Sequence, residues 1–395
     1  MTAPHRPGPL AGVTVVALEQ AVSAPLATRT LGDLGARVIK VENPRGGDFA
    51  RHYDDVVEGM AAHFVWVNRG KESLALDLKD PRGLDALHRL LAIADALVSN
   101  LAPGATERLG IGPAQLTARH PHLVAVEISG YGPGGPLSAK RAYDLLVQAE
   151  SGAASITGWE GRPAKAGPPM ADTSSGLYAA IAVLAGLYQR RTDGGGASAH
   201  VAMFDVMAEL MGYTLHVTRH TGVEQQPQGL GSPAVVPYGA FPTSDGHTVV
   251  LGTTNDREWQ RLARELLGRP DLADEPRYAT GTGRVAHRAE LHGAVADWCA
   301  RTDLATIQEA ADAAGIGNAR YNTASDVLAH PHLTARNRWR DVGTPGGPVP
   351  ALLPPIDAAG WDNRMDPVPA LGEHTDAVLR ELGLTDAEIT ALTGP

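Results

Sequence analysis

Apolar-rich runs alternate with helix-type patterns through the first half of the chain. Short runs of this kind are typical of parallel strands that are buried on both faces. They lie at residues 13–18, 37–42, 74–78, 96–99 and 123–128. Helical spacing covers residues 24–34 and 81–94, with Pro25 and Pro81 in first turns. The alternation predicts a doubly wound α/β domain with a parallel sheet.

The pattern changes in the second half. A helix at 174–190, a strand at 197–203 and a helix at 204–219 precede a Gly/Pro-rich linker at 221–237. A hairpin at 238–253 and three helical segments, at 256–267, 284–300 and 304–314, then predict a smaller α+β domain. A Pro-rich tail, expected to lack regular structure at 344–355, leads to a helix at 375–382. We therefore expect a large domain over 1–220, a small domain over 225–330 and a C-terminal segment over 331–395.

Composition narrows the function class. The 395 residues, 43% of them hydrophobic, suit two globular domains. A net charge of −10 argues against a nucleic-acid partner, since phosphate backbones require a basic face. The first residues lack an apolar signal core, and no apolar run is long enough to span a membrane. Cys299 is the single cysteine and the histidines are scattered, so we expect a cytoplasmic protein with no metal site.

Asp172 is the leading candidate for chemistry. It lies where the Gly/Pro segment 167–169 meets an apolar helix. Unpaired N–H groups at a helix start attract negative charge, and they would hold Asp172 in the ionised form that a carboxylate nucleophile needs. The alternative is a helix N-cap, a common role for aspartate.

Other chemistries receive less support. No GxGxxG motif follows the first strand, where residues 19–25 read EQAVSAP, so a nicotinamide-dependent dehydrogenase is not favoured. A second carboxylate, Asp144, follows Tyr143, and its ordinary role is a helix start that faces water. The sequence leaves open which acidic side chains share a pocket with Asp172.

Several ordered segments together resemble the class III (CaiB/BaiF-type) coenzyme A transferases. This family also contains formyl-CoA transferase, carnitine-CoA transferase and alpha-methylacyl-CoA racemase. The segments that carry the resemblance lie at 9–13, 31–42, 68–74, 100–104, 129–132, 143–144, 167–178 and 372–376. The resemblance covers essentially the whole chain.

The resemblance implies an interlocked homodimer, in which two subunits thread through one another like chain links. Each subunit would have a Rossmann-like large domain and a small domain, with the C-terminal segment returning to the large domain. Asp172 would be the nucleophile that forms a mixed anhydride and then an aspartyl-CoA thioester. Coenzyme A would enter as a thioester substrate, with no permanently bound cofactor.

The resemblance also implies a set of CoA-binding positions. They are Ala21, Val22, Ser23, Asn43, Leu76, Asn100, Leu101, Arg108 and Arg141. Arg108 is the main candidate for a phosphate ligand, with Arg45 or Lys71 as helpers. The chain departs from formyl-CoA transferase at Val22 and Asn43, where that enzyme has glutamine and arginine, and it lacks the glycine-rich lid sequence.

The expected acceptor is a small dicarboxylic acid such as succinate, mesaconate, itaconate or citramalate. Arg51, Arg69 and Arg320 are candidates for binding its second carboxylate, and Tyr143 is expected to line the acyl pocket. Racemases of the family carry a histidine where this chain has Tyr143, and tyrosine is a weak base at neutral pH, so transfer is favoured over racemization or epimerization. An intramolecular CoA transfer and a non-catalytic acyl-CoA binder are the remaining alternatives.

Overall fold

The computed structural model describes residues 6–393. The expectation that the first residues lack an apolar signal core falls partly outside this range. The chain divides into two compact units. The large unit contains the residues up to Ala153, Ala166–Tyr213 and the residues from Leu333 onward. The small unit contains Ala154–Lys165 and Thr214–His332, whereas the sequence suggested a small domain over 225–330.

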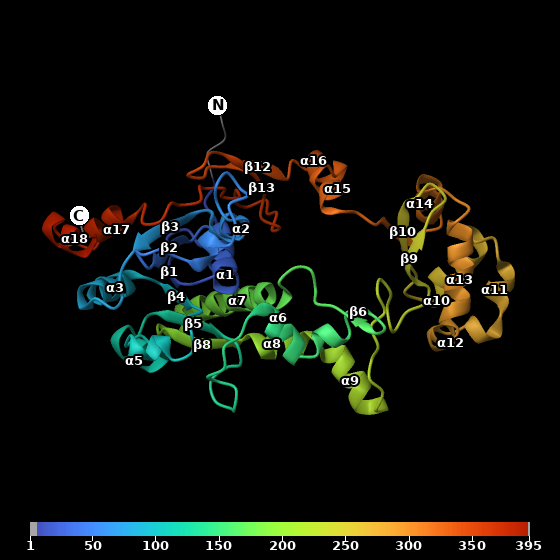
Figure 1. The fold of residues 1–395 in the computed structure, drawn as a ribbon, viewed down its shortest axis with the longest axis horizontal. Coiled ribbons are helices and arrows are strands. Elements are labelled where there is room, and N and C mark those ends of the chain that lie inside the picture. Colours follow the sequence, from blue (N-terminus) through green and yellow to red (C-terminus); the bar gives the residue numbers. More distant parts are fainter. Residues whose placement is uncertain (1–5, 394–395) are drawn as a thin grey trace. The chain divides into compact units, whose positions relative to one another are not determined.

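A six-stranded parallel sheet forms the centre of the large unit (Figure 1). Its order is β3-β2-β1-β4-β5-β8, and all neighbouring pairs are parallel. The strands are β1 (Thr14–Leu18), β2 (Arg37–Glu42), β3 (Lys71–Ala75), β4 (Ala96–Ser99), β5 (Val124–Ser129) and β8 (Ala197–Ala202). This order is that of doubly wound sheets that bind nucleotides, and it confirms the predicted parallel α/β domain.

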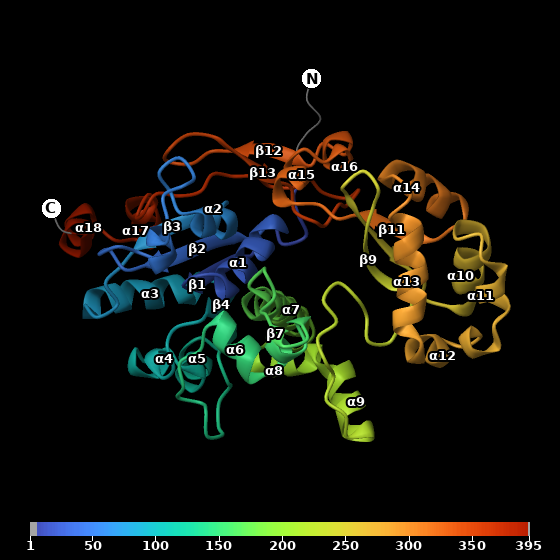
Figure 2. The same ribbon diagram turned by 45° about the vertical axis from the view of Figure 1, so that its right-hand side comes forward.

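Helices cover both faces of this sheet. Val16 and Leu18 of β1 pack into a core with α3 (Pro81–Ile93), and the alternate residues of the strand face the other side. There α1 (Ser23–Asp33) packs against α7 (Met170–Asp193), and the two helices adjoin in both Figures 1 and 2. By length and composition alone α7 could cross a membrane, but it packs against α1, β5 and β8 as a core helix.

Shorter elements complete the large unit. They are η1 (Phe49–His52), α2 (Ala62–Asn68), α4 (Ala105–Arg108), α5 (Pro113–Arg119), α6 (Asp144–Glu150), α8 (Met203–Leu210), β12 (Trp339–Val342), β13 (Val349–Leu352), α17 (Thr375–Glu381) and α18 (Asp386–Thr393).

The small unit has an antiparallel sheet in the order β11-β10-β9, formed by Gly317–Arg320, Thr248–Gly252 and Tyr238–Pro242. The hairpin expected at 238–253 is therefore confirmed. The main helices of this unit are α10 (Asp256–Arg261), α12 (Gly281–Ala286), α13 (Arg288–Cys299) and α14 (Leu304–Ala313).

Three sequence expectations are corrected. Strand β3 begins at Lys71 rather than at residue 74. Its charged first residue made the start of the strand look exposed in the sequence, but the Lys71 ammonium is buried against the Glu19 carboxylate. The helix expected at 204–219 is two helices, α8 and α9 (Gly212–Thr221), which meet at Gly212. The Pro-rich tail is not wholly irregular, since β12 and β13 pair as a hairpin.

The C-terminal segment closes the β3 edge of the parallel sheet. The N–H of Ser73 donates to His374 Nδ1 (3.2 Å), and the N–H of His374 donates to the Ser73 carbonyl (3.0 Å). Thr375 Oγ1 accepts from the N–H of Ala75 (2.9 Å). Leu379 and Ile389 of the following helices join the core beside α3, and these red helices adjoin the blue strand in both views (Figure 2).

Candidate active site

The site lies where the direction of the sheet connections reverses. In doubly wound sheets, ligands bind in the crevice beyond the carboxyl ends of the two strands at this point. Here these strands are β1 and β4, which are followed by Gln20 and Asn100. Asn100 Oδ1 accepts from the N–H of Gln20 (2.8 Å), and Asn100 Nδ2 donates to the Gln20 carbonyl (2.9 Å) and to Ser23 Oγ (3.1 Å). Asn100 therefore fixes the two loops to one another.

A cavity of about 580 Å³ opens at this position. Its lining comes from the large unit: residues 20–23 after β1, residues 100–103 after β4, Phe49 and Tyr53, His63, residues 128–130, residues 140–145, Pro169, Asp172 and Met203. This volume is in the range of small-molecule sites. The cavity thus combines the switch-point loops with the start of α7.

Asp172 lies in the first turn of α7, but it does not cap the helix. Pro169 is the N-cap residue and supplies no side-chain bond. Instead Asp144 Oδ1 accepts from the N–H groups of Ala171 (2.8 Å) and Asp172 (3.3 Å). No donor within residues 6–393 bonds the carboxylate of Asp172. The capping alternative therefore applies to Asp144, and the Asp172 carboxylate is left for chemistry.

Burial, followed by the neighbouring Asp144 carboxylate, raises the pKa of Asp172 to about 7. The sequence alone predicts a lowered pKa instead, because the N–H groups at a helix start favour the ionised carboxylate. A shift from 3.8 to about 7 corresponds to about 4 kcal/mol, whereas a helix N-terminus stabilises a nearby anion by about 0.3–2 kcal/mol. Burial and the second carboxylate therefore outweigh the helix start, and Asp172 exchanges its proton near neutral pH.

Most of the predicted CoA positions border the same cavity. Those that line it are Ala21, Val22, Ser23, Asn100, Leu101 and Arg141, together with the predicted acyl-pocket residue Tyr143. Ala21 has a φ of 60°, in the left-handed region. The guanidinium of Arg141 has no hydrogen bond or ion pair within residues 6–393. The structure thus brings seven predicted residues together with Asp172.

Three other predicted CoA positions lie outside the cavity lining. Asn43 Oδ1 accepts from the N–H of Arg45 in a local turn, and Leu76 is buried in the core of the large unit. Arg108 is exposed at the end of α4. The suggested helper Arg45 pairs with Asp77 (3.2 Å).

The arginines predicted to bind a second carboxylate are engaged elsewhere. Arg51 binds Glu42 through two bonds (2.7 and 2.9 Å) and stacks on the ring of Phe64. Arg69 is buried and donates to both oxygens of Asp33. Arg320 belongs to the small unit, where it lies 3.7 Å from Asp326. Because acidic side chains already bind Arg51 and Arg69, neither offers a free cation to the cavity.

Several lining residues were not among the predicted site residues, including Gln20, Phe49, Tyr53, His63 and Lys140. Gln20 could have been found, because it lies two residues after the buried strand that leads into the switch point. The rings of Phe49, Tyr53 and His63 form a chain of edge and tilted contacts, with centroids 5.8 and 5.6 Å apart. These rings meet at the cavity only because of the way η1 folds, and the spacing of the three residues along the chain does not predict that fold.

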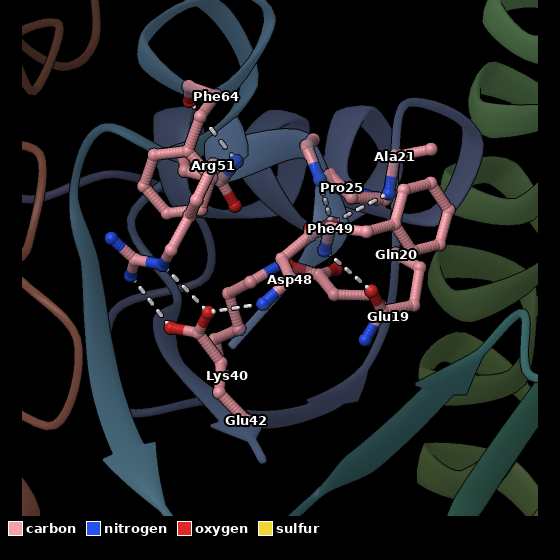
Figure 3. Close-up of polar contacts among 12 residues, drawn as sticks. Glu19, Gln20, Ala21, Pro25, Lys40, Glu42, Asp48, Phe49, Arg51 and Phe64 are labelled. Carbon is pink, nitrogen blue, oxygen red and sulfur yellow. Dashed lines mark hydrogen bonds and ion pairs between the residues drawn. The ribbon is translucent and has the colours of Figure 1, made fainter. Parts of the chain in front are cut away.

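A buried network of charged side chains lies beneath the loop after β1 (Figure 3). Glu19 accepts from Lys40 (3.2 Å) and Lys71 (2.6 Å). Asp48 Oδ2 accepts from Lys40 (2.8 Å), while its Oδ1 accepts from the N–H groups of Ala21 (3.0 Å) and Ala50 (2.9 Å). The suggested phosphate helper Lys71 is therefore a buried member of this network.

The sequence and fold are similar to those of known CoA-transferases. The family model for CoA-transferase family III matches residues 10–375. The succinate–glutarate CoA-transferase of Agrobacterium fabrum is 33% identical over 96% of this chain and 97% of its own length. The succinyl-CoA–D-citramalate CoA-transferase of Chloroflexus aurantiacus is 31% identical over 99% and 98%. The crystal structure of a CaiB/BaiF family protein from Brucella suis aligns with a TM-score of 0.81 and 33% identity, covering 95% of this chain and 100% of that one.

These matches confirm the resemblance inferred from the ordered segments, since the family model and both relatives extend across nearly the whole chain. The site is consistent with them, because it places a carboxylate in a cavity at the nucleotide-binding edge of the sheet. The chain belongs to CoA-transferase family III and is an enzyme of that family.

Proposed function

We propose that the enzyme moves CoA from an acyl-CoA thioester to a small dicarboxylic acid through a thioester on Asp172. The observation that carries the proposal is the Asp172 carboxylate, which lies in the cavity without a hydrogen-bond donor from residues 6–393. The names of the relatives supply the substrate class, since they refer to succinate, glutarate and D-citramalate. A C4 or C5 dicarboxylate is therefore the proposed acceptor.

The proposed reaction begins when ionised Asp172 attacks the carbonyl carbon of the donor thioester. The carbon–sulfur bond breaks, and CoA leaves as a thiolate while a mixed anhydride forms. The thiolate then attacks the aspartyl carbonyl and releases the donor acid as a carboxylate, which leaves an aspartyl-CoA thioester. The acceptor carboxylate repeats these steps in reverse and restores Asp172. Exclusion of water protects both intermediates from hydrolysis.

Positive charge in the cavity supports a carboxylate-bearing substrate. Lys140 and Arg141 both line it. Lys140 pairs with Glu150 (2.8 Å), whereas Arg141 has no acidic partner within the described residues. Arg51 and Arg69 bind Glu42 and Asp33. The proposal therefore assigns an anionic group of the substrates, a CoA phosphate or the second carboxylate of the acid, to Arg141.

The test is an incubation with succinyl-CoA and a panel of mono- and dicarboxylic acids, followed by mass spectrometry. New acyl-CoA species that require both donor and acid support transfer and identify the acceptor. The Asp172→Asn variant should fold, bind CoA and lose at least about a thousandfold in kcat, because a neutral amide cannot replace the carboxylate as nucleophile. Undiminished transfer by this variant contradicts the mechanism.

The same experiment separates the alternatives. Deuterium uptake at the alpha carbon of an acyl-CoA, without an acceptor acid, identifies a racemase or epimerase. Isomerization of a single acyl-CoA without a free acceptor identifies intramolecular transfer. Saturable CoA binding without turnover across the panel identifies a binding protein.

We further propose that the enzyme is an interlocked homodimer in the cytoplasm, and that it holds no cofactor beyond its CoA substrate. An exposed apolar stripe on α7 supports the dimer. Leu177, Ile181 and Tyr188 are 49%, 59% and 74% exposed, and their spacing places them on one side of the helix. Apolar surface of this kind commonly marks a protein interface.

A further inference from the structure

We propose that Asp48 is a positioning residue for CoA transfer: from outside the cavity it fixes the wall that the β1–α1 loop and η1 form. Asp48 is fully buried and does not line the cavity. The inference rests on the proposed function, because it takes this cavity to be the site of transfer. It assigns a role to the segment GGDFAR (46–51), whose Arg51 was a candidate for binding substrate.

Asp48 joins two segments of the cavity wall. Its Oδ1 accepts from the N–H of Ala21 in the β1–α1 loop (3.0 Å) and from the N–H of Ala50 in η1 (2.9 Å). In a further hydrogen bond between the same two segments, the N–H of Phe49 donates to Gln20 Oε1 (3.0 Å). Because Gln20, Ala21 and Phe49 all line the cavity, these bonds make one wall of two chain segments.

The Ala21 bond holds an unfavourable backbone conformation. Ala21 has a φ of 60°, and a non-glycine residue in the left-handed region is strained by about 1–2 kcal/mol. A hydrogen bond to a buried carboxylate is stronger than one between neutral groups, so the Asp48 carboxylate can maintain this turn. Loss of the bond should let the loop relax toward a more common conformation.

The surrounding hydrogen bonds and ion pairs hold Asp48 in place. Three acids and three bases form the network: Glu19, Glu42, Asp48, Lys40, Arg51 and Lys71. Glu42 Oε2 accepts from the N–H of Asp48 (3.0 Å) and from Arg51 Nε (2.9 Å), which fixes η1 from below. A Cβ at Gly47 would lie 2.7 Å from this oxygen, so the close approach requires glycine.

A purely structural role predicts a different outcome from a positioning role. A structural network affects only the free energy of unfolding. A positioning network also affects kcat/KM of the folded enzyme, since a displacement of about 1 Å at a reacting centre can cost about a hundredfold. The two roles are distinguished by substitutions at Asp48 that remove the ion pair with Lys40 but keep an acceptor for the Ala21 N–H, compared with substitutions that remove both.

The experiment compares Asp48→Ala, Asp48→Asn and Asp33→Asn in the transfer assay, below the melting temperature of each variant. Asparagine keeps an oxygen for the Ala21 and Ala50 N–H groups but loses the ion pair, so kcat/KM should stay within about threefold of wild type while stability falls. Alanine loses both, and kcat/KM should fall at least about tenfold. Asp33→Asn disrupts a buried pair with Arg69 away from the cavity, so it should lose stability without a loss of kcat/KM.

A second variant keeps the test decisive if Asp48→Ala does not fold. Asp48→Ala/Lys40→Met removes the buried charges together, so no buried ammonium is left unpaired and much of the stability should return. The Ala21 bond is still missing, so kcat/KM should remain at least about tenfold low. Values within threefold of wild type for the folded double variant overturn the inference.

The Asp172→Asn enzyme is assayed alongside. If it is inactive while every Asp48 variant is normal, the positioning role fails and the proposed function stands. If Asp172→Asn transfers CoA normally, the proposed function itself fails.

Discussion

Asp172 is subject to two opposing influences, the positive end of α7 and the combined effect of burial and Asp144. The second is larger, and it raises the pKa of Asp172 to about 7. A nucleophilic carboxylate must be ionised, so the free enzyme should gain activity as this group loses its proton.

We predict that kcat/KM for the acyl-CoA donor rises with pH through a midpoint near 7. In Asp144→Asn the midpoint should fall, because the neighbouring negative charge is gone while an oxygen can still cap α7. Initial rates at subsaturating donor between pH 5 and 9 measure both profiles. Equal midpoints in the wild-type enzyme and Asp144→Asn would show that Asp144 does not control the ionisation of Asp172.

Stability should respond in the opposite direction. The folded-state pKa of Asp172 lies above its unfolded value of 3.8, so the folded state binds the proton more tightly. This contribution is fully present below about pH 4 and is lost as pH rises through 7. Asp172→Asn cannot ionise, and it should be more stable than wild type by about 4 kcal/mol at pH 8, with a smaller difference at pH 4. Urea unfolding at both pH values measures the effect, and equal differences at the two values contradict it.

Single residues were predictable from sequence only where their surroundings are local. The position of Asp172 at the start of a helix was evident from the adjoining Gly/Pro segment, whereas its role as a nucleophile was implied by the family resemblance. The capping role of Asp144 was missed, since it acts on an N–H group 27 residues away. Arg51 and Arg69 looked available to substrate because their partners, Glu42 and Asp33, belong to other elements.

At the level of elements, the α1–α7 contact sets where Asp172 lies relative to the switch-point loop. One helical turn after Asp172, Gly176 packs against the start of α1, and a Cβ there would lie 2.5 Å from the Ser23 carbonyl oxygen. Ser23 itself lines the cavity. The glycine therefore brings the helix that carries Asp172 against the loop after β1.

We predict that Gly176→Ala destabilises the large unit by about 1–3 kcal/mol, because backbone must move apart to admit a methyl group. It should also lower kcat/KM through the shift at Ser23. Gly293→Ala is the matched control, since it also lies within a helix but its Cβ would meet open space. The control should gain about 0.5–1 kcal/mol from helix propensity. Thermal unfolding and transfer assays of both variants test this, and a stabilised Gly176→Ala contradicts it.

Elements were predicted best where an apolar run coincides with a buried strand. β2 and β4 have the expected limits, and β1 and β5 differ by a residue at their ends. β3 was misplaced because two charged residues begin it, and one of them is buried in the polar network. The β12–β13 hairpin was missed because prolines in the tail suggested irregular chain, although a proline fits within its short paired strands.

On the scale of the whole molecule, the apolar stripe of α7 predicts the oligomeric state. We expect a dimer by light scattering at micromolar concentration. Ile181→Glu should impair dimer formation, because a buried unpaired carboxylate is strongly disfavoured. Ile93→Glu is the control, since Ile93 is similarly exposed (56%) but lies on α3, outside the stripe. A wild-type monomer, or an Ile181→Glu dimer as stable as the control, argues against this interface.

The closure of the β3 edge has a consequence for the order of folding. Ser73 and His374, which bond one another there, are 301 residues apart in sequence. During synthesis, the edge of β3 therefore lacks its cover until nearly the entire intervening chain has been translated. Contacts between such distant positions form slowly, and an unpaired edge is prone to bind other chains in the meantime. The nascent protein should consequently depend on chaperones late in translation, when most of the strands already exist but the segment that covers the sheet edge has yet to emerge from the ribosome.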